Sequence, residues 1–361
     1  SKKTEFYDNV TVGVLCGGSG TRLWPLSTER VPKPFHKLSD KNHTLLNLTL
    51  KRALNLGRTT LLASYKHKDL VEKELDRVQD SLKKNQIVET FYEPISKNTF
   101  APIALLALKS FLKNKRSKVI VLPSDHYIDD HDQFDASMRN MLNALEKVPL
   151  LLLGVKPSFA DSSLGYILQD ESIDKNFTKV ARFVEKPNQV DADRLFKKRN
   201  VLWNTGIVGF RSKDFLDEVK TFFPGMHMKL FSIDPNCEKD IAEYYKSAPN
   251  LSVSRAILEY SSRQFCLKAD KIIWSDIGTW ERVSNLGDQS PLGIHEEINA
   301  KNCRNVKLLS FSRQEAKKKF TVIGISDVIV VETDTDVFIT KEGESELVKE
   351  ILSSNKDKKA A

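Results

Sequence analysis

Short apolar segments alternate with amphipathic segments of helical length through most of this chain, and that alternation constrains the fold more than any other feature. The strand-like segments are Val12–Leu15, Thr59–Ala63, Val119–Leu122, Leu150–Val155, Val180–Val184, Ile207–Phe210 and Gln264–Lys268. The helical segments between them include Leu45–Leu56, Leu70–Leu82, Pro102–Leu112 and Phe134–Leu145. This order predicts an α/β fold, with helices on both faces of a doubly wound, mixed or mostly parallel sheet. Ligands of such sheets bind at the carboxyl ends of the strands.

The pattern changes after about Leu286, where short strands follow one another closely with no long helix between them. We therefore expect a large α/β domain over residues 1–286, a small β-rich domain over 287–350 and a disordered basic tail over 351–361. A short left-handed β-helix is one candidate arrangement of the β-rich part, although no hexapeptide repeat is visible.

The composition excludes several functional classes. The longest apolar segment is too short to cross a membrane, and the first residues lack the apolar core of a secretory signal. The four cysteines are scattered, as in reduced cytoplasmic proteins. The net charge is +8, but the lysine clusters are dispersed and not interleaved with aromatic residues, which disfavours nucleic acid. A polyanionic small molecule remains a suitable partner.

A glycine-rich loop follows the first strand. Gly17, Gly18 and Gly20 allow a tight turn and a close approach to a ligand, and Arg22 adds a guanidinium, a combination that suits phosphate. A lone loop of this kind is about as often an ordinary turn. Lys33 lies between two prolines that hold it outside any helix, so it could bridge two phosphates or lie in a surface turn.

Further polar side chains follow later strands. Asp125 and Asp276 are each compatible with a Mg²⁺ ligand at a strand end or with a helix N-cap. Glu185 and Lys186 form either a solvated turn or a site for sugar hydroxyls and a phosphate. Asn204 offers a donor and an acceptor to a hydroxylated ligand.

Together these motifs resemble the sugar-phosphate nucleotidyltransferases, and within them the mannose-1-phosphate guanylyltransferase branch. The signature GGSGTRLWPLS spans residues 17–27, and PKPF follows at 32–35. The segments EP, NT, PSDHYI, GYI, FVEKP, WNTG and SDIGTW come in the family's order, and the resemblance covers roughly residues 10–340. It implies a Rossmann-like, GT-A-like nucleotidyltransferase fold.

The resemblance also implies roles for individual residues. GTP, mannose 1-phosphate and Mg²⁺ would be bound, with Arg22 and Lys33 as catalytic residues. The nucleotide would contact Leu15, Gly17, Gly18, Gly20, Thr21, Asn98, Thr99, Pro123 and Ser124. The sugar phosphate would contact Gly165, Tyr166, Glu185, Lys186 and Asn204, and the metal Asp125 and Asp276. A homodimer is compatible with the pattern, and neither a nucleic-acid nor a membrane partner is expected.

Two alternatives stay open at this point. Pyrophosphorylases that use UTP or dTTP with glucose 1-phosphate share the glycine loop. Some proteins of this fold are inactive regulatory subunits, although the full set of charged residues in this chain favours an enzyme.

Overall fold

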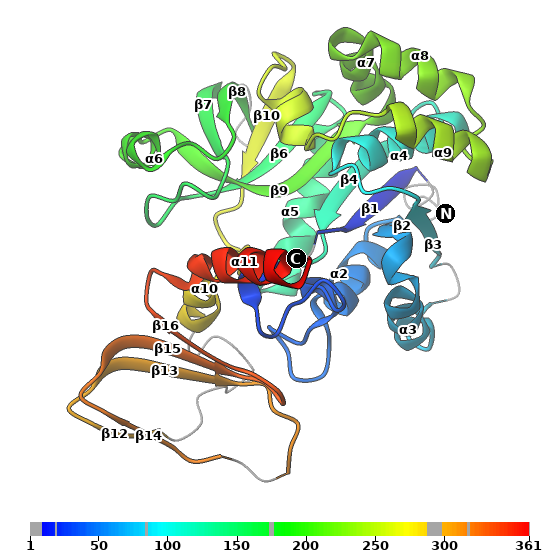
Figure 1. The fold of residues 1–361 in the computed structure, drawn as a ribbon. Helices are drawn as coiled ribbons and strands as arrows, with labels where there is room; N and C mark the ends of the chain where they lie inside the picture. The colour runs from blue at the N-terminus through cyan, green and yellow to red at the C-terminus, as the bar shows by residue number, and fades with distance from the viewer. Residues whose placement is uncertain are drawn as a thin grey trace. The chain divides into compact units, whose positions relative to one another are not determined.

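The computed structural model describes residues 9–18, 20–83, 86–172, 177–286, 298–315 and 318–360. The chain forms two compact units (Figure 1). Unit 1 contains residues 1–17, 49–124 and 128–274, and unit 2 contains residues 18–48, 125–127 and 275–361. Within the described ranges, no helix combines the length and apolar composition that a membrane span needs.

Unit 1 is built on a nine-stranded sheet with the strand order β3-β2-β1-β4-β9-β6-β10-β8-β7. The strands are β1 (Val10–Cys16), β2 (Arg58–Ser64), β3 (Val88–Glu93), β4 (Lys118–Pro123), β6 (Leu150–Val155), β7 (Tyr166–Ser172), β8 (Thr178–Val184), β9 (Val201–Arg211) and β10 (Gln264–Lys268). Strands β3, β2, β1 and β4 are parallel neighbours, whereas β9 runs antiparallel to β4, β6 and β7. The sheet is therefore mixed, with its parallel half at the end that carries the glycine loop.

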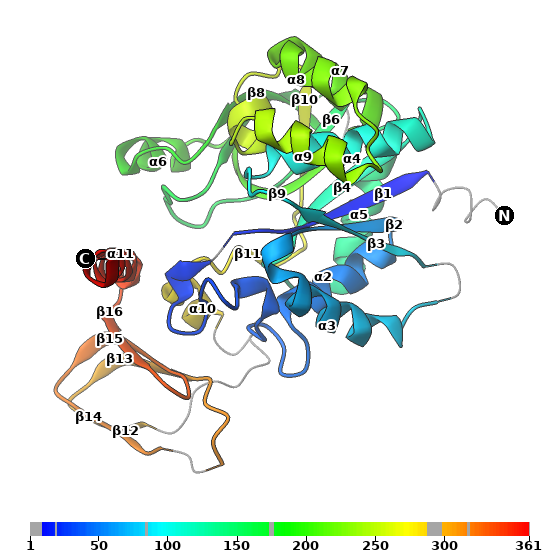
Figure 2. The same cartoon turned by 45° about the vertical axis from the view of Figure 1, so that its right-hand side comes forward.

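Helices cover both faces of this sheet. They are α3 (Lys68–Gln79), α4 (Phe100–Lys113), α5 (His131–Ala144), α6 (Gln189–Phe196), α7 (Ser212–Phe222), α8 (Pro224–Ser232) and α9 (Glu238–Ser247), and α2 (Leu45–Leu54) joins the two units in sequence. Short helical turns lie at Tyr65–His67 and Ser254–Leu258. Figure 2 shows α4, α7, α8 and α9 on one face and α3 on the other. The apolar core between sheet and helices centres on α4, in which ten residues are buried and eight of them belong to the core cluster.

Unit 2 combines the glycine loop with the C-terminal strands. Its elements are η1 (Thr21–Leu23), η2 (Lys33–Phe35), α10 (Trp280–Asn285), β12 (Ile298–Lys301), β13 (Arg304–Ser310), β14 (Phe320–Ile323), β15 (Ser326–Glu332), β16 (Val337–Lys341), η6 (Ser345–Leu347) and α11 (Val348–Ala360). The short strands β5 (Tyr127–Ile128) and β11 (Trp274–Ser275) pair with each other.

The two parallel strand pairs of unit 2, β12–β14 and β13–β15, have the same sequence offset between paired residues. Ile298 pairs with Phe320 and Arg304 with Ser326, so each ladder joins residues 22 positions apart. Backbone angles repeat at the same interval, because Asn302 and Gly324 both have positive φ. A constant offset with matching corners is the arrangement of two stacked β-helix coils. The left-handed sense of such a helix stays a prediction.

One apolar cluster unites the segments of unit 2. Leu23 and Leu38 come from the N-terminal part, Trp280 from α10, and Ile329 and Val331 from β15. These side chains bury a common surface, so the segment that follows the glycine loop packs with the C-terminal strands in unit 2. The residues expected to form a disordered tail instead continue helix α11 as far as Ala360.

Candidate functional site

Lys33 lies at the centre of a polar cluster in unit 2. Pro32 has an extended backbone (ψ 164°) and begins the single turn η2, which places the lysine side chain inside the unit. Lys33 is only 4% exposed. Its Nζ donates to the main-chain oxygen of Asp276 at 2.6 Å and lies 3.5 Å from Oδ2 of Asp125. The two aspartates named from the sequence therefore meet at one ammonium group.

The charges of this cluster depend on one another. Burial lowers the pKa of the Lys33 ammonium, and the carboxylates of Asp125 and Asp276 counter part of that effect. Burial by itself would raise the pKa of the Asp125 carboxyl, but the charges of Lys33 and His126 outweigh it and hold the pKa below its usual range. The cluster is therefore a partly buried ion pair, in which the Asp125 carboxylate compensates the charge of the buried Lys33 ammonium.

Asp276 has a second partner that the sequence did not suggest. Nη1 of Arg282 donates to both carboxylate oxygens of Asp276, at 2.7 and 2.6 Å. The N-cap of α10 is Thr279, whose hydroxyl accepts from the main-chain nitrogen of Arg282. Asp276 is therefore not a helix cap, because that position is filled by another residue.

Asp125 is not a helix cap either. It precedes the short strand β5, and the cap of the following helix α5 is Asp130, whose carboxylate accepts from the main-chain nitrogen of Gln133. The capping interpretation is thus wrong for both aspartates, whose carboxylates instead pair with Lys33 and Arg282.

The glycine loop lies directly against Lys33. Gly20 has φ +58°, and a Cβ at this position would lie 2.7 Å from Cβ of Lys33, so only glycine fits here without strain. Gly18 also has positive φ, at +86°. Thr21 and Arg22 follow in the turn η1. The loop, the turn and the buried lysine are thus one local structure.

Arg22 approaches the same cluster from the other side of Gly278. A Cβ on Gly278 would lie 2.6 Å from Oδ2 of Asp276 and 2.9 Å from Nη2 of Arg22. Nη1 of Arg22 also pairs with Oε1 of Glu346 at 3.1 Å. The arginine of the signature is therefore held by a carboxylate from the C-terminal segment.

Glu281 fixes the segment that carries Glu346. Its Oε1 accepts from the main-chain nitrogens of Gly343 at 2.8 Å and of Ser345 at 3.2 Å, and its Oε2 accepts from the hydroxyl of Ser345. Sequence reasoning missed Arg282, Glu281 and Glu346. The first two directly follow the SDIGTW motif, which is a signal that could have identified them, whereas nothing in the sequence marks Glu346.

The nucleotide-site candidates of unit 1 fall in two segments. Leu15 pairs with Pro123 across strands β1 and β4, and the main-chain nitrogen of Ser124 donates to the oxygen of Leu15 at 3.1 Å. A Cβ on Gly17, which comes next after β1, would meet nothing within 4 Å. The carboxyl ends of β1 and β4 thus lie side by side, with open space at Gly17.

Asn98 and Thr99 form the second segment, at the start of α4. Asn98 has φ +63°, and its side-chain oxygen accepts from the main-chain nitrogen of Thr99 at 2.9 Å. The Thr99 hydroxyl accepts from the main-chain nitrogen of Val253 at 2.8 Å. The hydroxyl of Thr99 therefore ties α4 to a neighbouring loop, which gives it a structural contact that sequence reasoning did not foresee.

The sugar-site candidates gather where β7, β8 and β9 adjoin. The main-chain nitrogen of Asn204 donates to the oxygen of Gly165 at 2.9 Å, and a Cβ on Gly165 would lie 3.4 Å from Oε2 of Glu185. Nζ of Lys186 lies 3.9 Å from Oε1 of Glu185 and is well exposed. Gly165, Glu185, Lys186 and Asn204 therefore form one polar corner of unit 1.

Tyr166 is placed differently from the expectation. Its side chain is fully buried, and its hydroxyl donates to the main-chain oxygen of Asp161 at 2.9 Å and accepts from the nitrogen of the same residue at 2.8 Å. Both hydrogen-bonding capacities are satisfied inside unit 1. The side chain of Tyr166 therefore supports the fold and is not free to bind a sugar.

A magnesium site on Asp125 and Asp276 agrees with the chemistry of the donors, since Mg²⁺ takes one or two carboxylates and completes its shell with water and phosphate oxygens. Within the described parts of the chain, no three histidine, cysteine or acidic side chains lie close enough together to hold a metal by themselves. Asp276 would also have to exchange Arg282 for the ion. The donor chemistry therefore suits Mg²⁺ only if Asp276 releases Arg282 and water and phosphate oxygens supply the other ligands.

Comparison with known proteins identifies the family of the chain. Residues 12–289 match the family described as "Nucleotidyl transferase". The chain is 29% identical to mannose-1-phosphate guanylyltransferase 2 of Escherichia coli O157:H7, over 94% of this chain and 72% of that protein. It is 28% identical to mannose-1-phosphate guanylyltransferase RfbM of Salmonella typhimurium, over 94% and 71%.

A solved structure shares the fold over nearly the whole chain. It is described as mannose-1-phosphate geranyltransferase from Thermus thermophilus, and it matches with a TM-score of 0.79 and 24% identity. The match covers 96% of this chain and 99% of that one. The two proteins therefore have the same fold, including the C-terminal strands.

Proposed function

The chain belongs to the nucleotidyl transferase family, and from that membership we propose that it transfers GMP from GTP to mannose 1-phosphate, which gives GDP-mannose and pyrophosphate. The observation that carries the proposal is the buried ammonium of Lys33 beside the glycine loop, between Asp125 and Asp276. The guanine base and the mannose come from the names of the relatives described above.

The residues proposed to bind the phosphates of GTP lie in unit 2. Gly18 and Gly20 have positive φ, and main-chain nitrogens in loops of this kind are common partners of phosphate oxygens. Arg22 and Lys33 would stabilise the negative charge that passes to the leaving pyrophosphate as the bond to the α-phosphorus breaks. The attacking phosphate of mannose 1-phosphate is already ionised at neutral pH, so the reaction needs no general base. Catalysis of this kind depends on positioning and charge stabilisation.

The residues proposed to bind mannose 1-phosphate lie in unit 1. Glu185 has an acceptor beside Gly165, and Asn204 lies next to the same glycine. These groups are suited to the hydroxyls of a hexose, and the exposed ammonium of Lys186 is suited to its phosphate. Tyr166 is left out of the set because its hydroxyl is already paired.

Magnesium belongs to the same proposal. Asp125 and Asp276 would hold the ion, which would neutralise part of the phosphate charge. If both aspartates serve one ion, Asp125→Asn and Asp276→Asn should each raise the Mg²⁺ concentration needed for half-maximal turnover, and the double variant should be little worse than either. Wild-type Mg²⁺ dependence in one of the single variants removes that residue from the site. A homodimer and a cytoplasmic location stay predictions from the sequence.

A panel of substrates tests the reaction and its alternatives. The protein is incubated with Mg²⁺, one of GTP, UTP or dTTP, and mannose 1-phosphate or glucose 1-phosphate, while pyrophosphate release is followed and the nucleotide sugars are separated by chromatography. We expect the fastest release with GTP and mannose 1-phosphate. Preference for UTP or dTTP with glucose 1-phosphate identifies another pyrophosphorylase, and no release with any pair favours the regulatory subunit.

A further inference from the structure

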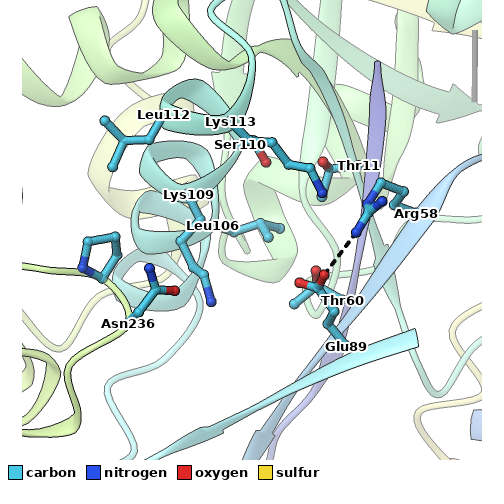
Figure 3. A pocket seen from close by; sticks show the side chains of 11 residues that line it. Thr11, Arg58, Thr60, Glu89, Leu106, Lys109, Ser110, Leu112, Lys113 and Asn236 are labelled. Carbon is cyan, nitrogen blue, oxygen red and sulfur yellow. Dashed lines mark hydrogen bonds and ion pairs between the residues drawn. The ribbon is translucent and has the colours of Figure 1, made fainter. Parts of the chain in front are cut away.

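A cavity lies on unit 1 between the sheet and helix α4 (Figure 3). Its volume is about 370 Å³, within the range of small-molecule sites. The strands β1, β2 and β3 supply one wall and the last turns of α4 supply the other. Thr11 in this wall is six residues before Gly17, which at the rise of a β-strand corresponds to about 20 Å. The cavity is therefore separate from the phosphate loop after β1.

Positive charge predominates in the cavity. Arg58, Lys109 and Lys113 line it, and Glu89 is the acidic residue among its lining groups. Glu89 pairs with Arg58 at 3.1 Å. Among the described residues, Lys109 and Lys113 have no carboxylate within ion-pairing distance. They stand one helical turn apart, an arrangement in which like charges repel. Figure 3 shows the side chains of Lys113 and Arg58 extending toward the same space.

Ser110 supplies an independent indication of a ligand. The residue is 4% exposed, it lines the cavity, and its hydroxyl oxygen has no hydrogen-bond partner among the described residues. A buried hydroxyl without a partner destabilises the folded protein, and in native structures such a group calls for an explanation, of which a bound molecule is one. The hydroxyl-bearing residues Thr11 and Thr60 and the amide of Asn236 line the same space.

We propose that this cavity binds a small phosphate monoester that carries hydroxyl groups, such as a hexose phosphate. The two lysines have a net charge of +2 to match the dianionic phosphate, since Glu89 compensates Arg58. The hydroxyl of Ser110 gains the partner that the protein does not provide. The remaining hydroxyls and the amide of Asn236 suit the ring hydroxyls of a sugar.

The test measures binding to the full chain by calorimetry, with glucose 6-phosphate and inorganic phosphate as probes, in the absence of nucleotide. We expect glucose 6-phosphate to bind saturably and more tightly than inorganic phosphate. The double variant Lys109→Gln/Lys113→Gln should raise its Kd at least tenfold. The variant Ser110→Ala should raise Kd about threefold or more, while the Tm of the free protein stays the same or rises, because a buried unpaired hydroxyl is removed.

Two controls separate this site from the rest of the molecule. Lys197→Gln/Lys198→Gln makes the same change of charge at exposed positions and should leave Kd unchanged. Lys33→Ala should also leave it unchanged, because that residue belongs to the phosphate cluster. The proposal is overturned if glucose 6-phosphate does not bind, or if Lys33→Ala abolishes binding while the cavity variants retain it. Equal affinity for inorganic phosphate overturns the recognition of hydroxyl groups. Since the readout is binding, the result does not depend on the proposed reaction.

Discussion

Lys33 is the residue on which the proposed chemistry depends most. Lys33→Ala should lower kcat by a factor of about 10²–10³, as the loss of one preorganised stabilising donor does in other enzymes, and should change the KM for mannose 1-phosphate much less. The measurement is steady-state pyrophosphate release. Lys37→Ala removes an exposed lysine from the same segment and serves as the control. A Lys33→Ala variant with near-normal kcat would exclude this role.

Glu93 gives a prediction about pH. Burial raises the pKa of its carboxyl to about 7, and the side chain is 9% exposed. A carboxyl whose pKa is raised on folding stabilises the fold in its protonated form, so stability falls as pH rises from about 4.5 to 7. The wild type should lose up to about 3 kcal/mol over this interval through this group.

Urea unfolding at pH 5 and pH 8 tests the role of Glu93. Glu93→Gln keeps the shape of the side chain but cannot ionise, so its free energy of unfolding should exceed that of the wild type at pH 8 and match it at pH 5. Glu89→Gln, in the same strand but exposed, is the control. A wild type and a Glu93→Gln variant with the same pH profile would show that Glu93 ionises freely in the folded protein.

At this scale the sequence predicts residues within motifs better than their partners. Lys33, Asp125 and Asp276 were named from local patterns, and the structure brings them together. Glu346 was missed, because an ion pair between residues 324 positions apart leaves no local trace. Arg282 was missed although it follows the SDIGTW motif directly. Tyr166 illustrates the opposite error, since a residue inside a motif proves to be part of the packing.

At the scale of elements, the glycine loop allows a comparison between Gly20, whose position requires glycine, and Gly17, whose position does not. Gly20→Ala should destabilise the protein by about 1–2 kcal/mol, because alanine disfavours positive φ, and its methyl group would press on Cβ of Lys33. Thermal unfolding should show a lower Tm, and kcat should fall because the lysine is displaced.

Gly17→Ala is the matched control for the loop. Its Cβ would meet nothing within 4 Å, and its backbone does not require glycine, so the Tm should stay unchanged. Reduced activity at unchanged Tm in this variant would point to a ligand that approaches the backbone closely. Equal loss of Tm in Gly17→Ala and Gly20→Ala would contradict the structural distinction between the two glycines.

The elements that sequence reasoning missed share a physical cause. Strand β3 is only partly buried and carries charged residues, so its apolar signal is weak. The coils of β12 to β15 repeat every 22 residues through backbone geometry at Asn302 and Gly324, and not through identical side chains. Apolar segments that are buried throughout, such as β6, were predicted with the observed bounds.

At the scale of the whole molecule, the compact units do not follow the order of the chain, because each unit combines segments that are distant in the sequence. Unit 2 takes its core from residues near both ends of the chain, including Leu23 and Val331. A division of the sequence into consecutive domains cannot represent this, because composition changes along the chain while packing joins distant segments. Arg22 and the C-terminal segment therefore belong to one compact unit, and the contact between them can be tested by experiment.

Glu346 carries the prediction that follows from this arrangement. Its carboxylate pairs with Arg22, which the proposed function assigns to the phosphates of GTP, so the two acceptors compete for one guanidinium. The pair is partly exposed, with side-chain exposures of 29% and 52%, and such pairs contribute at most about 1 kcal/mol. Glu346→Gln should therefore lower the KM for GTP about two- to fivefold at low salt, with kcat nearly unchanged.

The salt dependence of KM and a neighbouring variant show whether Glu346 competes with GTP for Arg22 or orients Arg22 for binding GTP. Added salt should reduce the difference between Glu346→Gln and the wild type, because it screens the exposed pair in the wild type. Glu344→Gln makes the same change of charge at an exposed position two residues earlier and should leave KM unchanged. If Glu346→Gln instead raises the KM for GTP, the carboxylate orients Arg22 for phosphate, since loss of a competitor cannot weaken binding.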